Sequence, residues 1–161
     1  MRKDYVDSCV FLGFILEKDQ KCKDYVNTIG YKNRNTGIIS YFVISEIFLA
    51  IMIKNKDKEK NYEKLEKFKA FDYIDEIINK MLRERVLIIN KLNTNIVDEG
   101  LVKELKIINY SLNDDDIFHL IEAVKSKCDF FVTTDREIIE NIKLKDFLAN
   151  KYSLKIIDLK L

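Results

Sequence analysis

Apolar residues follow two alternating periodicities along this chain. Short apolar runs, the pattern typical of buried strands, lie at Tyr5–Val6, Ile38–Ile39, Val86–Ile89, Phe130–Thr133 and Leu154–Leu159. Between these runs, apolar residues recur at the three- and four-residue spacing of helices. This alternation predicts an α/β fold with a three-layer α/β/α arrangement and a mainly parallel central sheet of about four or five strands.

The segments between the predicted strands are expected to be helical. Ser40 is a suitable N-cap for a helix that runs to Met52 and places Glu46 among apolar neighbours. Apolar residues at 138, 139 and 142 predict one helix that continues through Leu148. Further helices are expected at Val10–Ile15, Lys18–Ile29, Tyr62–Leu82, Ile96–Leu105 and from Asp116 to Val124.

Acidic residues stand at both ends of one helix–strand unit. Asp114, Asp115 and Asp116 precede a helix whose apolar face begins at Ile117, and Asp135 directly follows the strand after it. The start of a helix after one strand and the end of the next strand lie at the same edge of a parallel sheet. Open α/β folds place their binding sites at that edge.

Four carboxylates stand where folding alone does not require them: Asp7, Glu46, Asp116 and Asp135. If they converge, their repulsion requires a cation, and carboxylates without a histidine or cysteine pair favour Mg²⁺ or Mn²⁺ over zinc. Such ions activate water for phosphodiester cleavage. Each acid also has a structural alternative, because the aspartates can cap helices and Glu46 can pair with a lysine or arginine.

Hydroxyl and imidazole groups accompany the acids. Thr133 lies two residues before Asp135 on the strand, so both point to the same face, and Thr133 is expected to hold a metal-bound water. Ser8 beside Asp7 can contribute similarly, and an ordinary strand role is the alternative for Thr133. His119 follows Asp116 by one helical turn, but a surface or packing role is favoured for it.

Composition limits the function classes. The chain has 161 residues and a net charge of +1, so it offers no overall attraction to nucleic acid or membranes. No apolar run is long enough to span a bilayer, and acids near the N-terminus argue against an export signal, so a cytoplasmic location is expected. Cys9, Cys22 and Cys128 show no metal or disulfide spacing and are expected to be free thiols. The chain is expected to form a single domain over residues 1–161.

The ordered set of motifs resembles the PIN-domain nucleases, which include the ribonuclease toxins of VapBC-type toxin–antitoxin pairs. The segments that carry the resemblance are YVDSCVFL, ISYFVISEIFLA and DIFHLIEAVKSKCDFFVTTD, which together extend over nearly the whole chain. The spacing of the last segment selects Asp116 over its two acidic neighbours. The resemblance implies a PIN-like fold with Asp7, Glu46, Asp116 and Asp135 as Mg²⁺ or Mn²⁺ ligands and Thr133 as the hydroxyl beside them.

The resemblance further implies an endoribonuclease in which a metal-bound water attacks an RNA phosphodiester. Arg34 or Arg136 is then expected to contact phosphate through its guanidinium group. A small antitoxin and a second copy of the chain are the expected protein partners. Two alternatives remain open: a PIN-fold module that binds RNA or protein without catalysis, and a structure-specific DNA nuclease. Residues 54–60 form a charged run. It is interpreted either as the solvent-exposed start of a helix or as a basic patch that faces RNA.

Overall fold

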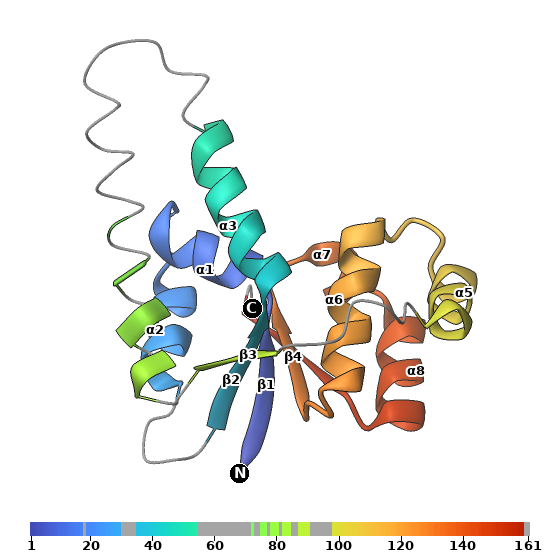
Figure 1. Cartoon of the computed structure of the whole chain (residues 1–161). Helices are drawn as coiled ribbons and strands as arrows, with labels where there is room; N and C mark the ends of the chain where they lie inside the picture. The colour runs from blue at the N-terminus through green and yellow to red at the C-terminus, as the bar shows by residue number, and fades with distance from the viewer. Residues whose placement is uncertain are drawn as a thin grey trace.

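A five-stranded parallel sheet forms the centre of the molecule (Figure 1). Its order in space is β3-β2-β1-β4-β5, so the first strand of the chain lies in the middle, between β2 and β4. The predicted α/β fold with a mainly parallel sheet is confirmed. The strands are β1 (Arg2–Val6), β2 (Asn35–Ser40), β3 (Leu87–Asn90), β4 (Phe130–Thr133) and β5 (Lys155–Asp158).

The computed structural model describes residues 1–17, 19–29, 35–54, 72, 75–76, 78–80, 82–84, 87–90 and 98–159. The charged run at 55–60 and Arg34 lie outside these ranges, as do most of the apolar positions that predicted a helix over 62–82. Ile78 from that segment is described and is buried.

Helices cover both faces of the sheet. In Figure 1, α1 (Ser8–Ile15) and α2 (Gln20–Thr28) lie on one side, and α5 (Glu99–Ile108), α6 (Asp114–Lys125) and α8 (Ile142–Tyr152) lie on the other. The longest described helix, α3 (Tyr41–Lys54), packs against α1. The described helices and the sheet together form the predicted three layers.

The central strand β1 has different polar contacts on its two faces, because successive side chains of a strand point to opposite sides. Tyr5 is fully buried and stacks on Phe131, with ring centroids 5.6 Å apart. On the opposite face, buried Asp4 accepts hydrogen bonds from Arg2, Tyr25 and Asn35 at 2.7–2.8 Å. These bonds satisfy a buried carboxylate and tie β1 to α2 and β2.

Side-chain caps set several helix starts. The Ser40 hydroxyl accepts a hydrogen bond from the Val43 backbone N–H at 3.2 Å, as its predicted N-cap role requires. The single helix predicted from residue 138 to Leu148 is wrong, because the chain forms α7 (Arg136–Ile139) and then α8. Asn141 separates them by accepting a bond from the Leu144 N–H at 2.9 Å, which leaves Ile142 largely exposed.

None of the described helices combines the length and apolar character that a membrane crossing needs. The three cysteines are free, as predicted.

Candidate metal centre

Asp7 directly follows β1 and lies at the N-cap position of α1, but its side chain makes no capping hydrogen bond. Instead, its carboxylate accepts hydrogen bonds from the Thr133 hydroxyl at 2.7 Å and from the Cys9 thiol at 3.1 Å. Asp7 is 6% exposed and Thr133 is fully buried. Burial and the nearby Asp7 charge raise the pKa of the Cys9 thiol well above its usual range, so Cys9 is a neutral donor here. The Asp7 carboxylate is therefore held by side chains from α1 and β4.

The Glu46 side chain is paired with His119. His119 Nε2 lies 2.7 Å from a Glu46 carboxylate oxygen, and the imidazole is almost fully buried while Glu46 is partly exposed. Burial alone would raise the pKa of Glu46, but the hydrogen bond and charge of His119, with a further bond from Ser8, lower it overall. Burial alone would lower the pKa of His119, and the bond to Glu46 with the charges of Asp7, Glu46 and Glu122 raises it. Both shifts favour an ion pair.

The other ring nitrogen of His119 contacts Tyr5. Nδ1 lies 3.0 Å from the Tyr5 hydroxyl oxygen, which also lies 2.7 Å from Glu122 and 3.2 Å from Ser40. Tyr5, His119, Glu122 and Ser40 are each at most 4% exposed. The Tyr5 hydroxyl has one hydrogen, and its shortest contact is to the carboxylate of Glu122, which only accepts when ionised. Because Tyr5 donates that hydrogen to Glu122, Nδ1 is the donor in its bond with the Tyr5 oxygen.

Asp116 and Asp135 extend the acidic group towards α6 and α7. Burial, followed by the charges of Asp135 and Asp7, raises the pKa of Asp116 to about 7. Burial is the largest cause of this shift, and the contributions of Asp135 and Asp7 show that their charges lie near enough to act on Asp116. Carboxylates from the β1–α1 junction, the start of α6 and the end of β4 therefore crowd one edge of the sheet.

The structural alternative for the aspartates was helix capping, and it applies to Asp135 but not to Asp116. Asn113 is the N-cap of α6, and its side chain accepts from the Asp116 N–H at 2.7 Å, so none of the three following aspartates has that role. Asp135 does cap the short helix α7 and accepts from the Glu137 N–H at 2.7 Å.

Thr133 aligns two of the acids. Its hydroxyl donates to Asp7 and accepts from the Asp135 backbone N–H at 3.0 Å. This contact fixes the start of the Asp135 segment relative to Asp7. The role of Thr133 in holding a water stays a prediction.

His119 was expected at the surface or in packing, and this expectation was incomplete. The ring is buried and packs on Tyr5 and Phe42, but both nitrogens make polar contacts inside the acidic group. The only sequence signal was its position three residues after Asp116, which places both side chains on one helix face. Ligand atoms of Asp7, Glu46 and His119 all lie within 4.8 Å of one another, a group that can hold a metal ion. The prediction of ligands made from carboxylates alone did not include this histidine.

The donor set fits a divalent cation. Carboxylate oxygens suit hard ions such as Mg²⁺ and Mn²⁺, and a positive ion would offset the repulsion that raises the pKa of Asp116. Asp7, Glu46 and His119 form this close group. Asp116 and Asp135 lie outside it, and Asp116 is linked to it by the electrostatic effect of Asp7.

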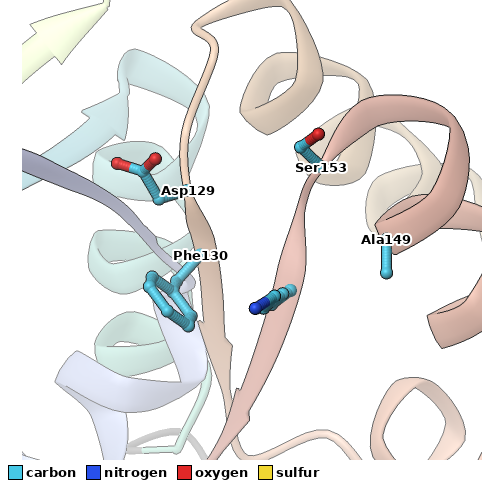
Figure 2. A pocket seen from close by; sticks show the side chains of 5 residues that line it. Asp129, Phe130, Ala149 and Ser153 are labelled. Atoms are coloured by element: carbon cyan, nitrogen blue, oxygen red, sulfur yellow. The ribbon is translucent and has the colours of Figure 1, made fainter.

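A separate hollow of about 380 Å³ lies at the opposite edge of the sheet (Figure 2). Its lining comes from the starts of β4 and β5 and from α8: Asp129, Phe130, Ala149, Ser153 and Lys155. The Asp129 carboxylate accepts from the backbone N–H of Lys3 at 2.7 Å. None of the predicted site residues lines this hollow.

Comparison with known proteins supports the fold. No protein-family model matches the sequence, and no curated protein matches it. Among solved structures, the chain is similar to the crystal structure of VapBC2 from Rickettsia felis bound to a DNA fragment from their promoter, with a TM-score of 0.62. The match covers 97% of this chain and 98% of that chain at 14% identity. The α/β fold of the present chain is accordingly PIN-like.

Proposed function

We propose that this protein is a metal-dependent endoribonuclease that hydrolyses RNA phosphodiester bonds at the acidic edge of its sheet. The observation that carries the proposal is the approach of Asp7 and Asp135 to the partly buried Asp116 carboxylate. Burial first, and then the charges of Asp135 and Asp7, raise the pKa of Asp116 to about 7. Like charges held together at such a cost are typical of functional sites. Asp7 and Asp135 lie just beyond the ends of the parallel strands β1 and β4, and α/β enzymes bind their substrates at such strand ends, which supports the proposal.

Asp7, Glu46, Asp116 and Asp135 are the proposed metal ligands, and Mg²⁺ or Mn²⁺ is the proposed ion. When bound, the ion would supply an activated water and neutralise charge on the phosphate. The protein groups have separate tasks. Thr133 and Cys9 orient the Asp7 carboxylate, and the Asp135 backbone is fixed through the same hydroxyl.

The arrangement also suggests how the substrate phosphate is held. Arg136 directly follows Asp135 and is exposed, so its guanidinium group is available to a phosphate at the site. The other candidate for this contact, Arg34, lies outside the described residues.

A protein partner belongs to the same proposal. The similar solved structure is a VapBC2 complex, and we propose that a small antitoxin binds this chain in the cytoplasm and restrains its nuclease activity. Co-expression with the product of the adjacent reading frame tests this. Recovery of a complex that no longer cleaves RNA supports a toxin, and an active nuclease with no bound partner contradicts it. Light scattering of the isolated chain tests the expected homodimer.

The central test is cleavage of single-stranded RNA in Mg²⁺ or Mn²⁺ by the wild-type protein and by Asp7→Asn and Asp116→Asn. Each substitution keeps the side-chain size and removes one charge, so the cleavage rate is expected to fall by about 10²-fold or more.

Asp115→Asn is the matched control, because Asp115 precedes Asp116 on the same helix but is exposed. It is expected to leave cleavage unchanged, and circular dichroism checks that each variant is folded. Equal cleavage by all folded variants would contradict the proposed site. A flapped DNA substrate assayed beside RNA separates the ribonuclease from a DNA nuclease.

A further inference from the structure

A histidine nitrogen lies inside the carboxylate group. His119 comes from α6, one turn after Asp116, and its Nε2 lies 2.7 Å from Glu46. The ligand atoms of Asp7, Glu46 and His119 fall within 4.8 Å of one another. Ligand bonds of about 2.1 Å place opposite ligand atoms of one ion about 4.2 Å apart. The three ligand atoms would therefore need to move only slightly towards one another to bind a single ion.

The second ring nitrogen of His119, Nδ1, has the kind of hydrogen-bond partner that metal-binding histidines usually have. A ligating histidine donates its second ring N–H to a hydrogen-bonded partner, which fixes the ring and its tautomer. Here Nδ1 lies 3.0 Å from the Tyr5 oxygen, and the single Tyr5 hydrogen is directed to Glu122 at 2.7 Å. In the ion-free protein Nε2 donates its proton to Glu46. An ion that binds Nε2 takes the place of that proton, and the Nδ1–H that remains keeps the Nε2 lone pair directed at the acids.

The surroundings hold this orientation firmly. Tyr5 is fully buried on the central strand, Glu122 is one turn along α6 from His119, and the ring also packs on Phe42. Rotation of the imidazole would break the bond to Tyr5 and leave a buried polar group without its partner, which is unfavourable.

We propose that His119 Nε2 is a direct ligand of the metal ion together with Asp7 and Glu46. An imidazole nitrogen suits first-row transition ions better than Mg²⁺, which prefers oxygen and retains its water. The site therefore selects an ion of the Mn²⁺, Fe²⁺ or Zn²⁺ class over Mg²⁺. This inference rests on the proposed metal site and defines its ion.

The chain contains a single histidine, which makes the test direct. Mn²⁺ is added to tag-free full-length protein, and pulsed electron paramagnetic resonance is used to detect coupling between the ion and ¹⁴N. A coupling of the strength of a directly bound imidazole can come only from His119 and supports the proposal. Bound Mn²⁺ with no such coupling overturns it, since His119 would then only orient Glu46.

Metal affinities provide a second readout. In calorimetry, His119→Gln is expected to weaken Mn²⁺ binding by about 10-fold or more and Mg²⁺ binding much less. Equal losses for both ions would indicate a structural role and contradict direct ligation. Tyr5→Phe removes the partner of Nδ1 and is expected to weaken Mn²⁺ binding by about 10-fold while the ¹⁴N coupling persists.

The two proposals fail in different ways. RNA cleavage with Mn²⁺ bound but without ¹⁴N coupling would leave the ribonuclease in place and remove the histidine ligand. Mn²⁺ binding with ¹⁴N coupling but no cleavage of RNA would retain the metal site and remove the ribonuclease.

Discussion

Asp116 is the residue at which the crowding of charge is clearest. Its pKa is about 7 in the folded protein against 3.8 for an ordinary aspartate. Between these two values the folded protein keeps a proton that the unfolded chain has lost. The stabilising effect of that proton is present near pH 4, declines as the pH rises, and is gone above pH 7.

Replacing Asp116 by asparagine should therefore stabilise the metal-free protein at high pH. At pH 8 the wild type carries the extra buried charge and the variant does not, so the melting temperature is expected to rise by about 2–4 °C, the effect of ~1 kcal/mol in a domain of this size. At pH 4 the difference should be small, because Asp116 is then protonated in the folded protein and partly protonated in the unfolded chain. Thermal melts in a chelator at both pH values measure this, and an equal shift at both would show that charge is not the cause.

Residue identities alone pointed to most of the residues of this candidate site. Asp7, Asp116 and Asp135 stand at element junctions, and Glu46 stands in an apolar helix, so each was visible as a polar group that folding does not explain. The part played by His119 was not visible, because the ring and its Glu46 partner lie 73 positions apart. Only the crossing of α3 and α6 at the sheet edge brings them together.

Close packing of α1 on α2 depends on a glycine. A Cβ atom at Gly13 would lie 2.8 Å from the Cys22 sulfur, and Cys22 is fully buried. Glycine costs a helix about 1 kcal/mol relative to alanine, so its presence here reflects the approach of the two helices.

Gly13→Ala is accordingly expected to lower the free energy of unfolding by about 1–2 kcal/mol, because overpacking exceeds the gain in helix propensity. Urea denaturation measures the change. In a Cys22→Ala background the cost of Gly13→Ala should shrink by about 1 kcal/mol or more.

Gly100→Ala is the control for this prediction. A Cβ there has only the Asp98 carboxylate nearby, at 3.4 Å, so this substitution is expected to leave stability unchanged or slightly higher. A similar loss at both glycines would point to backbone conformation instead of the contact with Cys22.

Elements were predictable where apolar spacing and capping residues agreed. The five strand positions and the Ser40 cap follow from the pattern, and β4 has the predicted bounds. The break between α7 and α8 was missed because the isoleucines keep helical spacing across it. The side chain of Asn141 decides the outcome, since it satisfies a backbone N–H that an uninterrupted helix would bond to a carbonyl.

At the scale of the whole molecule, the proposed ion would join segments that are far apart in the chain. Its ligands lie after β1, on α3, on α6 and after β4. An ion that binds only the folded state stabilises it by about 2.7 kcal/mol at a concentration 100 times its dissociation constant.

Saturating Mn²⁺ should therefore raise the melting temperature by roughly 5–10 °C at neutral pH, and a chelator should reverse the shift. Glu46→Gln should reduce the shift substantially. Glu104→Gln, which removes a surface partner of Lys151, should leave it intact. A shift of the same size in both variants would place the bound ion elsewhere.

The strand order has a consequence during synthesis. The N-terminal strand lies in the middle of the sheet, and Asp7 receives its hydrogen bond from Thr133, 126 positions later. A growing polypeptide therefore contains Asp7 early but lacks Thr133, which orients the Asp7 carboxylate, until 126 further residues have been added. The proposed hydrolysis therefore has to wait until the segment around Thr133 has been synthesised and has packed beside β1.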